Sequence, residues 1–351
     1  MFSSLGIVPL VVIFLAAAGA VWVAGIHLSS STDVLDTRLG LGEAIGGVIL
    51  LAIATNLPEI AITASAAVAN NLGIAVGNIL GGIAIQTVVL VVLDIAIGSE
   101  SALTTRAASL VLGLEGLLVI LVLAVVVMGT QLPAKHMLWR IEPASLLIAL
   151  FWVLGIFLIN RARHGLPWHD TTGTAPGGQE KPMGHSKVAA GEKMGLGRAA
   201  SIFGVAAAVT LGAGILLERS GEQIAGHLGM SGVVFGATFL AAATSLPEVS
   251  TGIASVRLGD FQLAVSDIFG GNAFLPVLFL LAGLLSGSAV LPQAQDTDIY
   301  LTALGIVLTV IYGWGLITRP HRQVARMGMD SVAVFVLYAV GIIGLIAVSH
   351  G

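Results

Sequence analysis

The sequence predicts an all-α polytopic membrane protein, with about ten transmembrane helices in two inverted five-helix repeats. Three observations lead to this fold class. Hydrophobic residues make up 56% of the 351 residues and charged residues only 10%, whereas a soluble domain carries about 25% charged residues. About ten segments are apolar for the roughly 20 residues that a bilayer requires. Two parts of the chain also resemble each other at one constant spacing.

The repeat is clearest in two short motifs. Ala54 to Glu59 reads A-T-N-L-P-E, and Ala243 to Glu248 reads A-T-S-L-P-E, at a fixed offset in residue number (248 − 59 = 189). The same offset relates Asn78, in G-N-I-L-G-G, to Asp267, in S-D-I-F-G-G (267 − 78 = 189). One offset over two motifs and the segment between them indicates a duplicated structural unit.

The apolar segments fix how the two units are oriented. The predicted spans are 5–27, 42–69, 72–97, 106–129, 139–160, 198–219, 231–256, 261–286, 297–318 and 330–349. The first motif lies in the second span and its copy in the seventh. Because five spans separate them, the second unit enters the membrane from the opposite side. Such inverted repeats are typical of transporters, with a binding site near the membrane midplane.

The domain boundaries follow from composition. We predict a first repeat at 1–160 with its motif at 54–86, a flexible linker at 161–197, and a second repeat at 198–351 with its motif at 243–275. The linker is rich in Gly, Pro, His and Lys and has no apolar period. Residues 1–27 lack a basic start, so we expect a retained span and not a cleaved signal peptide.

The basic residues predict the orientation. With both termini outside and the linker in the cytoplasm, twelve of the 15 Lys and Arg residues lie on the cytoplasmic side. Three lie outside, namely Lys135, Arg140 and Arg219. We therefore expect an integral protein of the cell (inner) membrane in this orientation.

Composition also narrows the chemistry. The chain has no cysteine, which excludes disulfides, thiolate metal sites and cysteine nucleophiles. Its net charge of −4 and lack of a basic patch give no sign of nucleic-acid binding. We expect no bound cofactor; the expected partners are transported cations and the lipid bilayer, and nothing in the sequence indicates a particular oligomeric state.

A proline stands deep inside each motif-bearing span. Pro58 and Pro247 cannot donate a backbone hydrogen bond, so the carbonyls of Ala54 and Ala243 lose a partner. A dehydrated cation is one suitable partner, and a packing kink relieved by neighbouring helices is the alternative. Two repeat-related prolines, each followed by a glutamate, favour an ion site.

The acids beside these prolines support the same hypothesis. Glu59 and Glu248 lie in spans without a deep lysine or arginine, and a bare carboxylate at the bilayer centre costs at least about 2.5 kcal/mol. Protons or bound cations must neutralise them. Asp267 and Asn78 add further oxygen donors, and a ring of hard oxygens suits calcium better than zinc or copper.

Other polar residues have simpler interpretations. Asp94 is expected to be a hydrated carboxylate near a cytoplasmic interface. For Glu115, a structural hydrogen bond and a proton or water path remain equally open. Gln86 and Thr87 are expected to act in helix packing. The small-xxx-small patterns Gly77 to Gly81 and Gly232 to Gly236 predict close helix approach.

At these motifs the sequence resembles the calcium/cation antiporter superfamily, and especially its prokaryotic sodium/calcium exchanger members. Their repeats read G-T-S-L-P-E, followed by a G-N-x-x-G-S-N element. The resemblance implies that Glu59 and Glu248 bind calcium, that Thr55 and Thr244 contribute backbone carbonyls, and that Asn78 and Asp267 form the second polar pair. It further implies that Ser245 takes part in a sodium site, where Asn56 replaces the serine of the first repeat.

The chain departs from the family pattern at several sodium-ligand positions. Ile74 and Leu263 stand where the family has hydroxyls one turn before the Asn/Asp position, and Gly82 with Ile83 replaces a Ser-Asn pair. The calcium-type carboxylates are retained. The chain also lacks the G-N-x-x-E form of the calcium/proton exchangers.

These patterns predict a secondary active antiporter, not an enzyme, that exchanges calcium or a similar divalent cation against sodium by alternating access. Proton coupling is the alternative, since buried carboxylates can titrate. A cation channel is the second alternative. It is less favoured because a channel does not need inverted repeats. An intramembrane enzyme that uses the paired carboxylates is the least favoured.

Overall fold

A computed structural model of the chain describes residues 2, 4–39, 51–98, 101–107, 109–134, 137, 139–163, 194–320 and 322–350. Within these residues, eight helices are long and apolar enough to cross a membrane, or nine when a bent helix pair counts as one span. A shorter apolar helix, Leu57–Val68, belongs to the predicted span 42–69, whose first residues lie outside the described part. The predicted fold class is confirmed.

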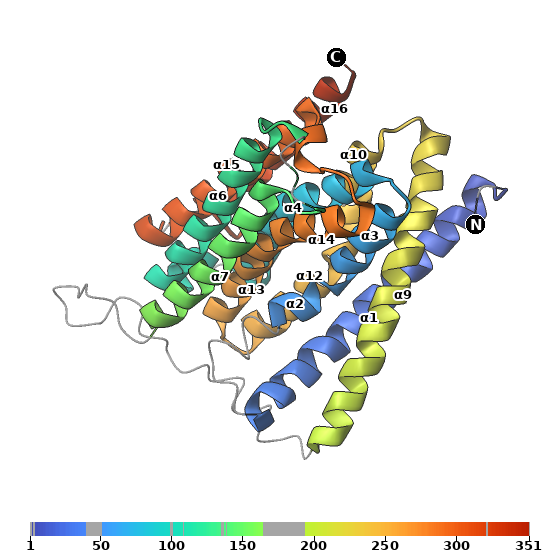
Figure 1. The fold of residues 1–351 in the computed structure, drawn as a ribbon. Helices are drawn as coiled ribbons and strands as arrows, with labels where there is room; N and C mark the ends of the chain where they lie inside the picture. The colour runs from blue at the N-terminus through green and yellow to red at the C-terminus, as the bar shows by residue number, and fades with distance from the viewer. Residues whose placement is uncertain are drawn as a thin grey trace.

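The chain forms the following elements (Figure 1). In the first half they are α1 (Ile7–Leu39), α2 (Leu51–Thr55), α3 (Leu57–Val68), α4 (Leu72–Ile97), α5 (Leu103–Arg106), α6 (Leu110–Thr130) and α7 (Pro143–Arg163). In the second half they are α9 (Leu196–Leu228), α10 (Gly232–Phe235), η3 (Gly236–Leu240), α11 (Ala241–Thr244), α12 (Leu246–Arg257), α13 (Phe261–Phe274), η4 (Leu275–Val277), α14 (Leu278–Ser286), η5 (Leu291–Gln293), α15 (Asp296–Thr318), β1 (Gln323–Val324), β2 (Met327–Gly328) and α16 (Met329–His350).

The helix boundaries repeat at the offset of the sequence motifs. Ile7–Leu39 maps onto Leu196–Leu228, and Leu57–Val68 maps onto Leu246–Arg257, with the same shift at both ends (196 − 7 = 189 and 246 − 57 = 189). The shift also carries α4 onto the run from α13 to α14 (261 − 72 = 189 and 286 − 97 = 189). The predicted linker falls mostly on residues 164–193, which lie outside the described part, so the domain boundaries stay predictions.

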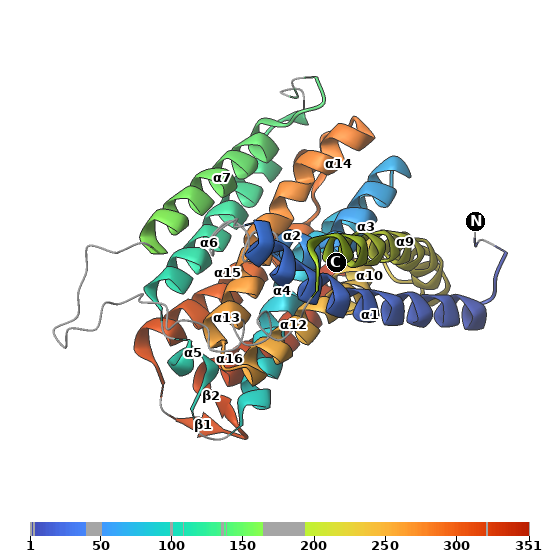
Figure 2. The ribbon, with the colours of Figure 1, turned by 90° about the horizontal axis from the view of Figure 1, so that it is seen from below.

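The first helices of the two halves pack side by side in opposite directions. Near one end, His227 of α9 lies 3.4 Å from the carbonyl of Leu5, and near the other end Val34 and Leu35 pack on Ala199. Figure 1 shows this antiparallel pair on one side of the molecule, and Figure 2 shows α6 and α7 on the side away from it. The opposite directions of α1 and α9 are those expected of an inverted repeat.

Both of these helices are longer than predicted. The expected spans ended at residues 27 and 219, whereas α1 continues to Leu39 and α9 to Leu228. A span predicted from hydropathy ends where polar residues such as His27 begin. In the structure, packing between the two helices stabilises the extra turns. The predicted boundaries were therefore wrong at these ends.

Close approach of α4 to α10 and η3 confirms the interpretation of the glycine patterns. A side-chain carbon added to Gly77 would lie 2.7 Å from the carbonyl oxygen of Val233, and one added to Gly81 would lie 2.1 Å from Cα of Ala237. In return, one added to Gly236 would lie 3.0 Å from the backbone nitrogen of Asn78. The two patterns thus pack against each other, as small residues allow in membrane helices.

A short hairpin after α15 was not expected from the sequence. β1 and β2 pair antiparallel, with Gln323 opposite Gly328 and Val324 opposite Met327. The turn residues Ala325 and Arg326 have φ values of 52° and 69°. A two-residue turn with both φ angles positive matches the twist of a hairpin, although glycine or asparagine usually occupies such positions.

Asp94 connects this hairpin to the bundle. Its side chain is fully buried and accepts hydrogen bonds from the backbone nitrogens of Leu103, at 2.7 Å, and Gly328, at 2.6 Å. The interpretation of Asp94 as a hydrated interfacial carboxylate was wrong. Periodicity places the residue near a helix end but does not reveal that two distant backbone segments cover it.

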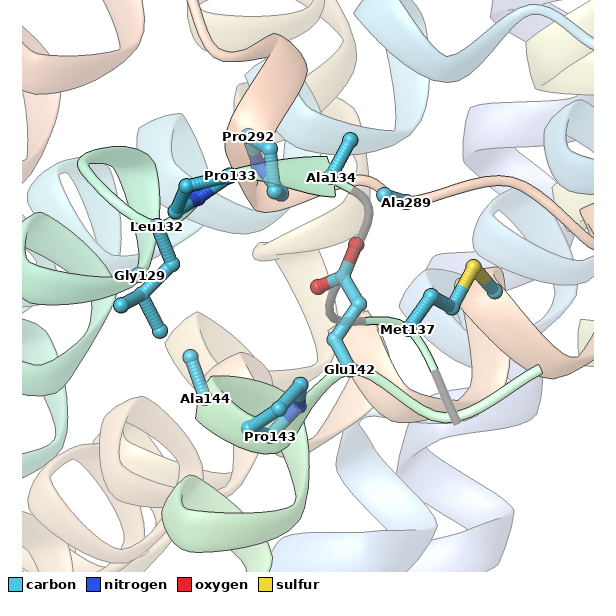
Figure 3. Close-up of a pocket in the computed structure, with 10 residues that line it drawn as sticks. All are labelled: Gly129, Leu132, Pro133, Ala134, Met137, Glu142, Pro143, Ala144, Ala289 and Pro292. Carbon is cyan, nitrogen blue, oxygen red and sulfur yellow. The ribbon is translucent and has the colours of Figure 1, made fainter. Parts of the chain in front are cut away.

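Glu142 has a comparable role before the start of α7. It accepts hydrogen bonds from Ser145 and from the backbone nitrogens of Val290 and Leu291, in the loop that precedes α15. The carboxylate faces a cavity of about 10 Å³ (Figure 3), which is the lower limit for one water molecule. Burial raises the pKa of Glu142 above its ordinary value of 4.5.

Candidate ion-binding site

The site is built on two helix breaks. α2 ends at Thr55 and α3 begins at Leu57, and α11 ends at Thr244 and α12 begins at Leu246. Pro58 and Pro247 stand in the first turn of α3 and α12, where a missing backbone donor costs little. The second helix pair bends by 41° at its break. The prolines therefore begin new half-helices inside the bundle.

The residue at each break bonds back to the preceding helix. The Asn56 amide donates to the carbonyl of Ala52 at 2.6 Å, and the Ser245 hydroxyl donates to the carbonyl of Ala241 at 2.8 Å. These two carbonyls are repeat-related (241 − 52 = 189). Asn56 thus makes the contact that Ser245 makes in the other repeat, and its amide oxygen remains for a further contact.

Glu59 and Glu248 both lie in the first turn of a half-helix. The side chain of Glu59 is fully buried, and Glu248 is 1% exposed. Carboxylates are stabilised near helix N-termini, where unpaired backbone N–H groups and the helix dipole favour negative charge. Neither glutamate forms a salt bridge with a residue that the structure describes. The sequence-based expectation of two acids without basic partners agrees with this arrangement.

Each repeat supplies a threonine that contacts the glutamate of the other repeat. The hydroxyl of Thr244, from the second repeat, donates a hydrogen bond to Glu59 of the first repeat. The hydroxyl of Thr55, from the first repeat, donates to Glu248 of the second. Each hydroxyl also lies 3.2 Å from a carbonyl of its own helix. The two breaks therefore face each other, which brings both glutamates to one place.

Gln86 of α4 lies between the glutamates. Its amide nitrogen is 3.4 Å from Oε1 of Glu59, 3.4 Å from Oε1 of Glu248 and 3.3 Å from Oδ1 of Asn56. These hydrogen bonds join α4 to both helix breaks, as expected of a residue that acts in helix packing, but the position of Gln86 between the two glutamates was not predicted. A polar residue two turns beyond Asn78 in an otherwise apolar helix was the available signal. The interpretation of Thr87 as a packing residue also agrees with the structure. Its hydroxyl accepts a hydrogen bond from Asn272 at 3.1 Å, which joins α4 to α13.

Several oxygens at the centre receive no hydrogen bond from the part of the chain that the structure describes. Oε2 of Glu59, Oε2 of Glu248 and Oε1 of Gln86 are buried without a partner among the described residues. A buried acceptor without a donor costs about 1–3 kcal/mol, and more when it is charged. Oxygen atoms of this kind, close together and unpartnered, suit a hard cation.

Asp267 lies beside this centre on α13. Its Oδ2 accepts a hydrogen bond from Thr251 of α12 at 2.8 Å, and its charge acts on Glu248 of the same helix α12. Thr251 was not predicted, because its counterpart in the first repeat is the apolar Ile62 (251 − 62 = 189). Behind Asp267, Ser266 donates to Glu115 of α6 at 2.9 Å, which favours the structural interpretation of that acid.

Asn78 occupies the equivalent position in the first repeat but has different surroundings. Its side chain is fully buried, and neither its nitrogen nor its oxygen has a hydrogen-bond partner among the described residues. Among the described residues no hydrogen bond joins Asn78 to Glu59 or Glu248, so its place in the predicted ring of donors stays a prediction. In the described part of the chain, no three His, Asp or Glu side chains gather to hold a metal ion. A cation between the glutamates must therefore also use amide, hydroxyl or carbonyl oxygens.

The arrangement can be compared with known proteins. The family model for the sodium/calcium exchanger protein matches residues 9–160 and 198–347, which is most of the chain in two separate blocks. The chain belongs to the sodium/calcium exchanger protein family. The two matched blocks correspond to the two halves that the repeat defines, and the resemblance inferred from the motifs is confirmed.

Curated relatives match over shorter segments. Inner membrane protein YrbG of Escherichia coli (strain K12) is 33% identical over 102 residues, which is 29% of this chain and 31% of YrbG. The putative antiporter CaxA of Alkalimonas amylolytica is 30% identical over 118 residues, or 33% of this chain and 37% of CaxA. The matched segments thus span about a third of these relatives.

Solved structures show the same fold for the exchanger family. The H⁺/Ca²⁺ exchanger CAX superposes with a TM-score of 0.67 at 10% identity, covering 97% of this chain and 87% of CAX. A sodium-calcium exchanger, NCX_Mj, superposes with a TM-score of 0.57 at 15% identity, covering 96% of this chain and 99% of NCX_Mj. Similarity at this level of identity establishes the fold alone.

Proposed function

We propose that this chain is a secondary active antiporter that moves calcium, or a similar divalent cation, against sodium by alternating access. The observation that carries the proposal is the glutamate pair. Glu59 and Glu248 are buried together at facing helix breaks, without a basic partner among the described residues, and each keeps one carboxylate oxygen without a donor there. A mobile cation compensates such a pair and can leave again.

The contacts in the structure support some of the predicted ligands more directly than others. Glu59, Glu248, Thr55, Thr244 and Asn56 lie in one contact network with Gln86. Asp267 acts on this network through its charge on Glu248. Ser245 bonds to its own helix, and Asn78 has no hydrogen bond to the network among the described residues, so both enter the proposal only by their repeat position.

Proton coupling is a second candidate because one observation favours it. The family's sodium-ligand hydroxyls are replaced by Ile74 and Leu263, and Gly271 packs so closely that an added side-chain carbon would lie 2.8 Å from the Asn56 amide nitrogen. The site therefore has fewer hydroxyls for a separate sodium ion. Its carboxylates, in contrast, can each carry a proton.

The decisive experiment is calcium uptake into everted membrane vesicles or proteoliposomes. Uptake against a calcium gradient is measured with an imposed sodium gradient and, separately, with an imposed proton gradient. Uphill uptake distinguishes an antiporter from a channel, which moves calcium only downhill. Absence of uptake under both gradients would contradict the proposed function.

The glutamates provide the matched variants for this experiment. Glu59→Gln and Glu248→Gln are each expected to abolish uptake, because an amide keeps the size of the side chain but removes its charge. Glu218→Gln is the control. Glu218 is also a fully buried glutamate in a membrane helix, but it bonds to Ser65 and Arg219 away from the site. Normal uptake by either site variant would remove that residue from the site.

A further inference from the structure

Two repeat-related glycines mark where the first helix of each repeat crosses the broken helix of the other. A side-chain carbon added to Gly25 of α1 would lie 2.7 Å from Cβ and 3.0 Å from Cα of Pro247. One added to Gly214 of α9 would lie 2.9 Å from Cβ of Ala61 and 3.0 Å from the carbonyl oxygen of Pro58. The two glycines occupy equivalent repeat positions (214 − 25 = 189), so the crossing occurs twice.

Close approach is not a general property of the glycines on these two helices. Gly221 of α9 is also close to a neighbour, at 2.7 Å, but that neighbour is a ring carbon of the Phe235 side chain and not the residue at a helix break. Gly19 of α1 and Gly212 of α9 lie on exposed faces of the same helices, and a side-chain carbon added to either would meet no atom within 4 Å. Gly25 and Gly214 are buried. The helices therefore need a residue without a side chain where they meet the prolines, and not along their whole length.

The position of each crossing gives it a consequence for the ion site. Pro58 directly precedes Glu59, and Pro247 directly precedes Glu248. At each break the proline removes one hydrogen bond from the helical ladder, although Asn56 and Ser245 still bond to both half-helices. The position of the second half-helix therefore depends more strongly on the elements packed against it. Ligands must be held within about 0.5 Å of their working geometry to bind well.

We propose that Gly25 and Gly214 are positioning residues of the ion site. Through Gly25, α1 of the first repeat sets the place of Glu248, and through Gly214, α9 of the second repeat sets the place of Glu59. This cross-repeat arrangement parallels the exchange of Thr55 and Thr244 between the two glutamates. The inference rests on the proposed function for its biological meaning, but the geometry can be tested without any ion.

The first test measures that geometry by cross-linking. Because the chain has no cysteine, the double variant Glu59→Cys/Thr244→Cys can be joined by a short bis-methanethiosulfonate reagent without background reaction. Adding Gly214→Ala is expected to lower the yield several-fold, because α9 and the start of α3 must separate. Adding Gly212→Ala is expected to leave the yield unchanged.

Two further variants separate positioning from general destabilisation. Gly341→Ala places a side-chain carbon 2.7 Å from Cδ1 of Leu304, between α16 and α15 and away from the helix breaks, and is expected not to change the yield. Ala61→Gly in the Gly214→Ala background removes one of the clashing atoms and is expected to restore part of the yield. If Gly214→Ala does not accumulate, Ala61→Gly alone loosens the same contact and is expected to lower the yield.

The second test measures calcium binding by the purified wild-type chain and its single variants. Gly25→Ala and Gly214→Ala are each expected to weaken binding about tenfold, whereas Gly19→Ala and Gly212→Ala keep the wild-type affinity. Wild-type protein that binds no calcium would contradict the proposed function, and the cross-linking result would still decide on the glycines. Equal cross-linking yields in the Gly214→Ala and Gly212→Ala backgrounds would overturn the positioning inference.

Discussion

At the scale of residues, the two repeats use the same position for different purposes. Asn56 and Ser245 both bond to the preceding helix, but only Asn56 also reaches Gln86. The repeat counterpart of Gln86 is Leu275 (275 − 86 = 189), so the second repeat has no amide at this position. The site is therefore symmetric in its two glutamates and two threonines, and asymmetric in Gln86 and in Asp267, whose repeat counterpart is Asn78.

Gln86 gives the most direct residue-scale prediction. Gln86→Leu removes an amide whose oxygen is buried without a donor beside two carboxylates, so we expect calcium to bind about tenfold more weakly, the equivalent of one lost hydrogen bond. Calcium titration of the purified protein measures this. Thr87→Val, a change of the neighbouring residue that contacts Asn272, is the control. An unchanged affinity in Gln86→Leu would exclude Gln86 from ion binding.

At the scale of elements, buried acids hold the loops at the ends of the bundle. Asp94 joins α4 to the start of α5 and to the hairpin, and Glu142 joins the start of α7 to the start of η5. Asp330, at the start of α16, accepts from Thr104 of α5 at 2.6 Å. In each case a carboxylate accepts hydrogen bonds from a segment outside its own helix, and these bonds hold that segment against the helix.

Asp94→Ala is expected to destabilise the fold without changing ion affinity. The substitution leaves two buried backbone N–H groups without an acceptor, at about 1–3 kcal/mol each. We expect the Tm in detergent to fall by about 5 °C or more, measured by thermal unfolding. Asp296→Ala, which removes an exposed acid from the start of α15, is the matched control. A Tm equal to that of the control would contradict the structural role of Asp94.

We expect the stability of the fold to depend on pH through the titration of Glu142. Because burial raises its pKa in the folded state, the folded protein binds this proton more tightly than the unfolded chain. The contribution of Glu142 is therefore most favourable below its ordinary pKa of 4.5 and declines as pH rises towards the raised folded value. The side chain in Glu142→Gln does not titrate, so the Tm of this variant should fall less than that of the wild type as the pH rises to neutral. Parallel curves of Tm against pH for the wild type and the variant would contradict this role of Glu142.

At the scale of the whole molecule, the antiparallel α1–α9 pair relates the two halves. The predicted orientation places the start of α1 outside and the start of α9 on the cytoplasmic side. Gly6 and Gly195 are exposed at these two opposite ends. A membrane-impermeant maleimide should label Gly6→Cys in intact cells and should label Gly195→Cys only after the membrane is opened. The reverse pattern would mean that the topology is inverted.

The repeat accounts for most of what could be predicted. The constant offset between the motifs also governs the ends of α1, α3 and α4, because a duplicated sequence carries its helix signals with it. The predicted glutamate pair and its threonines lie together in the structure. Asp94 was misinterpreted, and the position of Gln86 between the two glutamates was not predicted, since a polar residue in an apolar helix does not reveal which distant segment covers it.

The sequence by itself determined the membrane class, the duplication, the inverted order of the halves and the helix breaks with their acids, because all of these are encoded locally along the chain. Only the tertiary structure decided that each threonine serves the other repeat's glutamate, that Gln86 lies between the two acids and that Gly25 and Gly214 cross the opposite prolines. These features are contacts between segments far apart in the sequence, and such contacts depend on how the helices pack in three dimensions.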